Sequence, residues 1–339
     1  MHILAGFCDY EFVKKLLNEF QFKKYINARA GTSDRTPIHQ VIAAGNVEVF
    51  NLLIEHGADT YVQVSGKTIL HLLASMEDED CAVLFLKALN LTSRKDKNIL
   101  SSSEDILEGL TAFELAVYSS HLKIAELLLD AGSDPEAVKD RDPHFLALLI
   151  GLPTWDSLRS LQYYLDRVET PFIIRKSNAL SVLHMAASMM HYLADNLTEE
   201  QKFDLLLKRF SRDYQINAVT KRSGNSDLVA GQTPLHYAAK FGVFHAAQKL
   251  LQAGANPNAK DDDGKTPLDL ARSQLASLGE MVMEHEMFRV ITDLKSTVGL
   301  LERPKELQTI GTIQNENTEN KMVTKFSRLG FQTQPSGRN

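Results

Sequence analysis

The sequence predicts an all-α protein in which about eight helix-turn-helix repeats stack into a solenoid with projecting turns. Three observations support this prediction. A Thr-Pro-Leu-His motif recurs along the chain, a segment of paired small residues follows each copy, and a Leu-rich segment ending in Gly-Ala-Asp or a close relative completes the repeat. A single repeat would leave its apolar face in water, so the repeats must stack on their neighbours. We place this array in residues 1–298.

The motif is clearest at Thr36–His39 and Thr233–His236, and Thr266–Asp269 is a close copy. Looser copies follow the same pattern, and the fourth motif residue, here called the anchor, falls near residues 2, 39, 71, 114, 145, 184, 236 and 269. From residue 39 onward, three of the six spacings lie within two residues of 33. The longer spacings indicate insertions, and the even pattern indicates one array rather than separate globules.

The motif also predicts where the helices of a repeat begin and end. Thr can cap the first helix, and Pro fits its first turn, where the missing N–H costs nothing. Paired alanines such as Ala43-Ala44 and Ala238-Ala239 suit an inner helix that packs closely on its neighbours. The Leu-rich segment predicts an outer helix. We expect Gly57, Gly132 and Gly254 to end that helix in a left-handed conformation, which Gly adopts most easily.

These residues resemble the ankyrin repeat family, and the resemblance covers roughly residues 2–295. It implies that the anchor histidines form hydrogen bonds between adjacent turns. It also implies an extended concave surface, built from the turn tips and the exposed positions of the inner helices, on which partners bind.

Several repeats depart from the pattern. The chain begins inside a repeat, because His2-Ile3-Leu4-Ala5 matches the motif only from its His onward. Either the true start lies upstream of Met1, or the first unit is a half-repeat whose apolar edge a partner covers. The fifth repeat has Phe145 in place of the anchor His, and Leu158–Leu165 predicts its second helix. In the eighth repeat, a C-terminal capping pair of helices is expected to run to about Ser296.

Three insertions and a tail complete the organisation. Residues 92–108, 191–200 and 219–229 are either binding loops or tolerated padding. Residues 299–339 shift to Gln, Asn, Thr and Ser without periodicity, which predicts a disordered tail. Lys325–Phe331 within it is either a short docking motif or unstructured chain.

Composition narrows the function classes. The net charge of -6 provides no large positive field for phosphate backbones, which argues against nucleic acid. Cys8 and Cys81 are too few for a disulfide framework and indicate a reducing compartment. The best apolar run, Phe145–Trp155, is interrupted by Gly151 and Pro153, so we expect no membrane span. The sequence therefore predicts a soluble monomer of the cytoplasm or nucleus.

Candidate chemistry is weak. The four anchor histidines match no zinc spacing, and neither Gly-Lys-Thr triplet has the earlier glycine of a phosphate-binding loop. Asp261–Gly264 resembles a calcium loop, but Leu270 stands where a bidentate Glu is needed, so we expect a solvated hairpin tip. No nucleophile elbow or dinucleotide glycine pattern occurs. We expect no catalytic residues, no cofactor and no metal.

The binding surface can be placed by phase with the anchor. The fourth and fifth residues after each anchor should be exposed on the inner helix, and the residue before each Thr should lie at a turn tip. Aromatic, Met and Arg side chains are enriched in interface centres. The partner-binding candidates are Met76, Tyr118, Met189 and Phe241 as apolar contacts, with Arg35, Lys67, Lys240 and Lys265 as partners for acidic groups. Alternatively, Tyr118 or Phe241 packs against a neighbouring turn or insertion.

Two functions fit this pattern. The first is a protein-binding scaffold or adaptor that holds another protein on the concave surface. The second is a regulatory or targeting region of a larger enzyme or enzyme complex, which the incomplete first repeat suggests.

Overall fold

The computed structural model describes residues 9–19, 23–30, 34–89, 109–135, 144–152, 155–168, 173–175, 177–189, 196–222, 229–279 and 285–303. These residues are mostly helical, which confirms the predicted fold class. The chain divides into two compact units, an N-terminal unit of Met1–Thr170 and a C-terminal unit of Pro171–Asn339.

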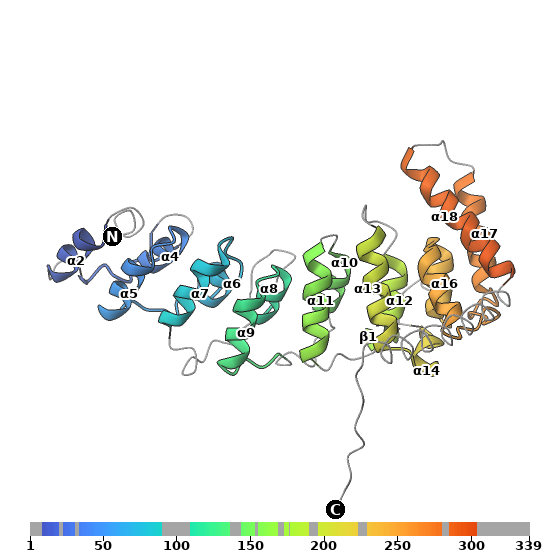
Figure 1. The fold of residues 1–339 in the computed structure, drawn as a ribbon, viewed down its shortest axis with the longest axis horizontal. Coiled ribbons are helices and arrows are strands. Elements are labelled where there is room, and N and C mark those ends of the chain that lie inside the picture. The colour runs from blue at the N-terminus through green and yellow to red at the C-terminus, as the bar shows by residue number, and fades with distance from the viewer. Residues whose placement is uncertain are drawn as a thin grey trace, which may run out of the picture. The chain divides into compact units, whose positions relative to one another are not determined.

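The N-terminal unit alternates inner and outer helices, and successive helix pairs lie side by side (Figure 1). The inner helices are α4 (Pro37–Ala43), α6 (Ile69–Ala74), α8 (Ala112–Tyr118) and α10 (His144–Gly151). The outer helices are α2 (Tyr10–Asn18), α5 (Val47–Glu55), α7 (Glu79–Ala88), α9 (Leu122–Asp130) and α11 (Trp155–Arg167). Each anchor in α4, α6 and α8 is the third residue of its helix, as the motif predicts.

The core of the N-terminal unit lies between neighbouring repeats. The rings of Phe50 on α5 and Phe85 on α7 meet edge to face with centroids 4.8 Å apart, and both are fully buried. In the fifth repeat, the buried ring of Phe145 meets Tyr164 of α11 at 5.0 Å. An aromatic contact therefore occupies the place of the missing anchor His, and the predicted second helix is present as α11.

The C-terminal unit begins with a two-stranded antiparallel hairpin of β1 (Ile173–Arg175) and β2 (Leu180–Ser181), in which Ile173 pairs with Ser181 and Arg175 with Leu180. Its helices are α12 (Val182–Met189), α13 (Asn196–Arg209), α14 (Asp213–Ile216), α15 (Pro234–Phe241), α16 (Phe244–Gln252), α17 (Pro267–Gly279) and α18 (His285–Glu302). Inner helices α12, α15 and α17 pack in succession, and α13 packs on α16. The short helix α14 was not predicted.

Helix α18 packs on α15, α16 and α17. Its residues Leu294 and Thr297 are fully buried. Gly242 ends α15 at φ +69°, and a Cβ atom there would lie 2.6 Å from Cγ of Leu294. Glycine is therefore required at residue 242 both for its backbone conformation and for the close approach of α18.

The structure describes parts of two of the three expected insertions. Residues 92–108 and the tail from residue 304 onward lie outside the described residues. The 191–200 insertion is shorter than predicted, because α13 already begins at Asn196. Residues 223–228 of the third insertion lie outside the described residues, and at its start the Thr220 N–H donates to the carbonyl oxygen of Gln232 at 2.9 Å and the Gly231 N–H to that of Thr220 at 2.8 Å.

Among the described residues, no helix has both the length and the apolar character that a bilayer span requires. Of the two cysteines, Cys81 lies on α7, and Cys8 falls outside the described part of the chain.

Candidate partner-binding surface

The motif positions each turn through a capping box. In the seventh repeat, the Thr233 N–H donates to His236 Nδ1 at 3.0 Å, and the Thr233 hydroxyl lies 2.9 Å from the same nitrogen. His236 Nε2 then donates to the carbonyl oxygen of Lys265, at 3.1 Å, in the next turn. The ring therefore caps its own helix and ties two adjacent turns together.

The same geometry recurs in other repeats. His71 Nε2 lies 3.1 Å from the carbonyl oxygen of Leu110, and His184 Nε2 lies 2.8 Å from that of Gln232. In the fourth repeat, the carboxylate of Glu114 replaces the ring and accepts from the Thr111 N–H at 2.8 Å. The bonds between adjacent turns that the family resemblance implied are confirmed for His71, His184 and His236, but not for His39. In His71, His184 and His236 both ring nitrogens have hydrogen-bond partners in the protein, so neither nitrogen is left to bind a metal.

His39 differs from the other anchor histidines. Its Nδ1 lies 2.7 Å from the Thr36 hydroxyl, but its buried Nε2 has no hydrogen-bond partner within the described residues. Burial, with contributions from the nearby charges of Arg35 and Arg29, lowers the pKa of His39 to about 4. Burial also lowers the pKa of His184 to about 4 and that of His236 below its ordinary value. All three rings are therefore neutral at pH 7.

Glycines close the outer helices as predicted. Gly57, Gly132 and Gly254 have φ values of 90°, 85° and 95°. At the end of α5, the Ala58 N–H donates to the carbonyl oxygen of Leu53 at 2.9 Å, and the Gly57 N–H donates to that of Ile54 at 3.0 Å. This pair of bonds is a Schellman motif, which satisfies carbonyls that the helix end would otherwise leave unpaired.

The hairpin tip at Asp261–Gly264 is only partly solvated. Asp262 and Asp263 are exposed, but Asp261 is buried. One oxygen of Asp261 accepts from the N–H groups of Asp263 at 3.1 Å and Lys265 at 2.9 Å, and the other accepts from Gln232 Nε2 at 3.2 Å. The prediction of a solvated tip is therefore wrong for Asp261, whose carboxylate holds the turn. No group of three His, Cys, Asp or Glu residues within the described part is placed to hold a metal.

The structure places four candidate partner-binding residues in the N-terminal unit. Arg35 and Lys67 precede α4 and α6, and both are half-buried. Met76 follows α6, and Tyr118 is the last residue of α8; both are also half-buried. The neighbouring tip position in the fourth repeat does not fit the prediction, because Leu110 is fully buried and contributes to the core.

The C-terminal unit holds the other four. Lys240 and Phe241 end α15 and are half-buried, and Lys265 is exposed at a turn tip. Met189 ends α12, and its side chain lies outside the described part of the structure. Gln232, at the equivalent tip position of the seventh repeat, is buried and bonded to Asp261, so tip position alone does not predict exposure.

Phe241 belongs to a row of rings that the sequence did not reveal. The ring of His184 meets Tyr237 edge to face at 5.1 Å, and Tyr237 meets Phe241 at 6.2 Å. Lys240 Nζ lies 5.7 Å from the centroid of the Phe241 ring. Tyr237 directly follows the anchor His236, and the sequence pattern did not assign this position to the binding surface. The ring contact with His184 of the preceding repeat could not be read from a single motif.

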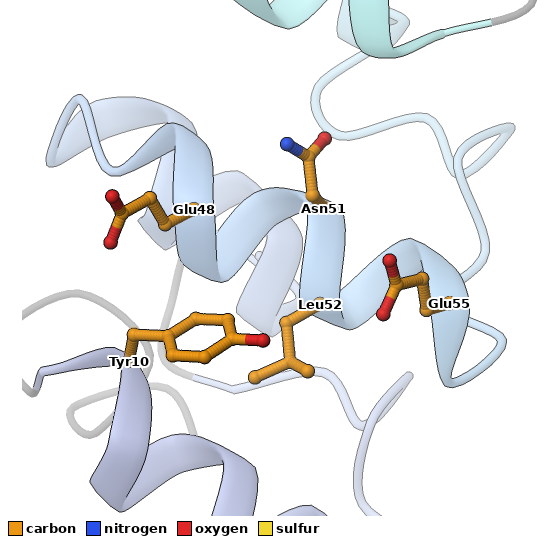
Figure 2. A pocket seen from close by; sticks show the side chains of 5 residues that line it. All are labelled: Tyr10, Glu48, Asn51, Leu52 and Glu55. Atoms are coloured by element: carbon orange, nitrogen blue, oxygen red, sulfur yellow. The ribbon is translucent and has the colours of Figure 1, made fainter.

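A separate hollow lies on the outer-helix side of the N-terminal unit (Figure 2). It has a volume of about 370 Å³, and Tyr10 of α2 lines it together with Glu48, Asn51, Leu52 and Glu55 of α5. The α5 residues share one helix face because they lie three, four and seven positions apart. None of the predicted partner-binding residues lines this hollow.

Comparisons with protein-family models match three stretches of the chain. A model of three ankyrin repeats matches residues 1–99, a single ankyrin repeat model matches residues 108–140, and a model of multiple ankyrin repeats matches residues 222–271.

Each of these curated relatives aligns with this chain over only part of its own length. The nuclear factor NF-kappa-B p105 subunit of Gallus gallus is 26% identical over 295 residues, which cover 80% of this chain and 24% of the relative. Phosphocholine transferase AnkX of Legionella pneumophila is 28% identical over 237 residues, or 67% of this chain and 23% of the relative. Mouse Rabankyrin-5 is 44% identical over 59 residues, or 17% of this chain and 5% of the relative. The matched stretches thus span about a quarter or less of these proteins.

Two solved ankyrin repeat structures align with this chain at low sequence identity and with TM-scores below 0.5. The ankyrin repeat domain of human ASB11 is 17% identical, covers 78% of this chain and 98% of its own, and gives a TM-score of 0.48. The ankyrin repeat domain of Bcl-3 is 19% identical, covers 87% and 96%, and gives a TM-score of 0.45.

The local geometry and the family models agree. Thr233 and His236 form the capping box that the repeat motif requires, and His236 reaches the next turn. This seventh repeat lies inside one of the matched stretches, and the repeats that contain Thr36 and Thr68 lie inside another. The chain belongs to the ankyrin repeat family.

Proposed function

We propose that this chain is a non-catalytic scaffold or adaptor that binds another protein through its inner helices and turn tips. The observation that carries the proposal is the set of histidine bonds between adjacent turns, from His71 to Leu110, from His184 to Gln232 and from His236 to Lys265. These bonds fix the backbone of the turns that they join. A surface that is ordered before binding loses less conformational entropy on association.

The candidate residues have the chemistry of an interface. In the N-terminal unit, half-buried Met76 and Tyr118 offer apolar area, and Arg35 and Lys67 offer positive charge. In the C-terminal unit, Phe241 offers apolar area beside Lys240 and Lys265, and Met189 ends the neighbouring inner helix. Aromatic, Met and Arg side chains are enriched in the centres of protein interfaces.

The polar groups of the motif support a non-catalytic role. The rings of His71, His184 and His236 are committed to hydrogen bonds that hold the turns. A general base needs a lone pair directed at a substrate, and these rings use theirs to cap helices. We further propose that the partner is a protein rather than a nucleic acid or a membrane, and that the chain acts as a monomer in the cytoplasm.

The proposal is tested by capture of a partner with crosslinking. We expect Tyr118→Ala with Phe241→Ala to reduce partner capture several-fold while leaving the helical circular dichroism spectrum unchanged. The matched control is Phe12→Ala with Tyr214→Ala, which removes one exposed aromatic from each unit away from the inner helices; these side chains are 44% and 61% exposed. Equal loss in both variants, or crosslinks confined to the outer helices, would contradict the proposal.

One observation favours a second candidate, a regulatory or targeting region of a larger enzyme. The stretch of phosphocholine transferase AnkX that matches this chain is 23% of that enzyme and covers 67% of this chain. In that case the repeats would position a catalytic domain located elsewhere. Sequencing the intact transcript decides between the two: an upstream catalytic domain supports the second candidate, and a single additional repeat or cap supports the scaffold.

A further inference from the structure

The hollow lined by Tyr10, Glu48, Asn51, Leu52 and Glu55, here called the outer hollow, combines two kinds of surface (Figure 2). Its middle is apolar, because Leu52 is only 2% exposed and the half-buried ring of Tyr10 lies across from it. Its two ends are acidic, because the exposed Glu48 and Glu55 lie on either side of these two residues. A side chain that fits both surfaces has an apolar stem and a positive charge.

The two carboxylates are spread along the outer helix α5. Glu48 and Glu55 are seven positions apart, which is about two helical turns or roughly 10.5 Å along the axis. Neither forms an ion pair with a residue that the structure describes. The exposed Asn51 lies between them in the helix and adds an amide that can accept a hydrogen bond. The outer hollow therefore offers acceptors along its length, and its carboxylates are available to a partner.

The position of Glu55 is unfavourable for α5 on its own. Glu55 is the last residue of the helix, where the unpaired carbonyl groups carry partial negative charge. Cations are favoured at such an end, yet α5 contains no basic residue. The next residue, His56, is engaged through Nδ1 with the carbonyl oxygen of Leu52 at 2.9 Å. A cation bound beside Glu55 would compensate both the carboxylate and the helix end.

The charges of α2 fall into two groups. Asp9 and Glu11 flank Tyr10 at the start of the helix, and both are exposed. Lys14 and Lys15 follow one turn later, and Lys14 Nζ lies 5.3 Å from the centroid of the Tyr10 ring. Lys14 is exposed and does not line the outer hollow, so water screens its repulsion of a cation bound there. None of the described residues that line the hollow is basic.

We propose that the outer hollow binds an arginine from a basic segment of a partner protein. The guanidinium of this arginine pairs with Glu55, its methylene stem packs between Tyr10 and Leu52, and a second basic residue of the segment pairs with Glu48. Arginine is favoured over lysine because its planar group bonds a carboxylate through two parallel N–H groups. The volume of about 370 Å³ lies at the small end of the range for ligand sites and suits one long side chain.

This inference goes beyond the proposed function, because it adds a second contact surface. The proposed function assigns the partner to the inner helices and turn tips, and none of the eight residues predicted to bind it lines the outer hollow. A partner that engaged both surfaces would gain affinity without any new contact at either one, provided that its linker could span them.

The test uses the full chain and a fluorescently labelled peptide with blocked ends, in which two arginines are separated by two alanines. Three extended residues span about 10 Å, which matches the spacing of the two carboxylates. We expect saturable binding, measured by fluorescence anisotropy, that weakens with added salt. Glu48→Gln with Glu55→Gln should weaken binding roughly tenfold, because two exposed ion pairs are lost.

The matched control is Glu19→Gln with Glu77→Gln, which removes the same charge from two other exposed glutamates of the N-terminal unit. Neither of them lines the outer hollow. Unchanged binding in this control supports the inference. Equal weakening in both double variants overturns it, because the peptide would then respond only to the charge of the whole chain, which is -6.

Two further measurements do not depend on a loss of binding by an altered chain. Lys14→Gln should tighten binding, because it removes a competing cation, and unfolding cannot produce this result. Unchanged or weaker binding by Lys14→Gln would place the peptide away from Tyr10 and overturn the inference. A peptide with lysines in place of both arginines keeps the charge but should bind several-fold more weakly. Equal binding of the two peptides would overturn the assignment to arginine.

Failure of the inference can be separated from failure of the proposed function. Tyr118→Ala with Phe241→Ala should bind the arginine peptide as tightly as the unaltered chain does, because neither residue lines the outer hollow. Loss of peptide binding in that variant would assign the peptide to the inner helices, so the inference would be wrong and the scaffold would stand. If the unaltered chain binds the peptide but captures no partner on its inner helices, the scaffold proposal is wrong and the outer hollow stands.

Discussion

His184 Nε2 donates a hydrogen bond of 2.8 Å to the carbonyl oxygen of Gln232, a residue 48 positions further along the chain. The same ring accepts from the Ser181 N–H at Nδ1 and meets Tyr237 edge to face. His184 is fully buried, so each of these contacts forms out of water. One side chain therefore caps its own helix, holds the next turn and packs against Tyr237, whose ring in turn meets Phe241.

This arrangement predicts that His184→Ala destabilises the C-terminal unit. The variant removes a buried ring. It leaves the Gln232 carbonyl oxygen without its donor and the Ser181 N–H, at the start of α12, without its acceptor. We expect a loss of about 2–4 kcal/mol in the free energy of unfolding, measured by urea denaturation. The control is His56→Ala, whose half-buried ring bonds to the Leu52 carbonyl oxygen of its own helix. A similar loss in both variants would show that the bond between turns contributes little.

The buried histidines also predict a pH dependence. The pKa values of His39 and His184 are lowered from 6.5 to about 4 by burial. The unfolded chain therefore takes up these protons at higher pH than the folded chain does. The contribution of these two histidines to the free energy of unfolding should be constant above a pH of about 6.5. It should fall between pH 6.5 and 4 and level off below pH 4. The total loss is up to about 3 kcal/mol for each histidine.

Urea denaturation at a series of pH values measures this effect. Other groups titrate in the same range, so the informative quantity is the difference in slope between the unaltered chain and His184→Asn, which lacks one of the titrating rings. We expect a shallower slope for His184→Asn between pH 6.5 and 4. Identical slopes would mean that His184 does not resist protonation in the folded protein.

Gly242 and Gly254 provide a matched pair of substitutions. Both have positive φ, +69° and +95°, but a Cβ at residue 242 would meet Leu294 at 2.6 Å, whereas a Cβ at residue 254 would have nothing within 4 Å. Gly254→Ala should introduce backbone strain alone and lower the free energy of unfolding by about 1 kcal/mol. Gly242→Ala should introduce the same strain and also displace α18, which lowers the free energy of unfolding by about 2–4 kcal/mol in total.

Hydrogen exchange distinguishes the two variants. In Gly242→Ala, amides of α18 should exchange faster than in the unaltered chain, because the helix no longer packs closely on the end of α15. In Gly254→Ala, exchange in α18 should stay unchanged. Faster exchange of α18 in both variants would assign the effect to global stability rather than to the Leu294 contact.

The sequence predicted the features of this fold that depend on local chemistry. Thr-Pro followed by a His at the anchor defines a capping box within four residues, so the starts of α4 and α15 could be placed from the motif. The glycines that end the outer helices could be placed for the same reason, since a left-handed residue there favours Gly. Each of these features needs information from one repeat only.

The candidate surface was harder to predict because it depends on neighbouring repeats. Leu110 and Gln232 occupy turn positions equivalent to Arg35 and Lys67, yet both are buried. Asp261 looks like part of a solvated acidic tip, but Gln232 of the preceding turn covers it. Tyr237 contacts the rings of His184 and Phe241, and its contact with His184 of the preceding repeat could not be seen in one motif. A periodic rule assigns a residue to a face, but the packing of the adjacent turn decides whether it is exposed.

The ion pair of Glu199 and Lys202 could not be expected from the sequence either. The two residues lie three positions apart on α13, a spacing typical of a surface pair, but their side chains are only 2% and 1% exposed. Lys202 Nζ lies 3.0 Å from Glu199 Oε1, and burial lowers the pKa of Lys202 from its ordinary value. A buried ion pair contributes little net stability, because the cost of desolvating both charges offsets their attraction.

This balance predicts opposite outcomes for single and double substitution. Lys202→Met alone leaves the Glu199 carboxylate buried without its ammonium partner and should cost about 3–5 kcal/mol. Lys202→Met with Glu199→Leu removes both charges, and we expect the free energy of unfolding to stay within about 1 kcal/mol of the unaltered chain or to exceed it. The exposed pair of Lys123 and Asp80, 2.7 Å apart, is the control, and breaking it with Lys123→Met should destabilise the chain far less than Lys202→Met does, because water screens the pair. Urea denaturation of the three variants measures the difference. If the double variant is as unstable as Lys202→Met, the charges themselves hold α13 in place, and the packing of this outer helix depends on an electrostatic bond rather than on its apolar face.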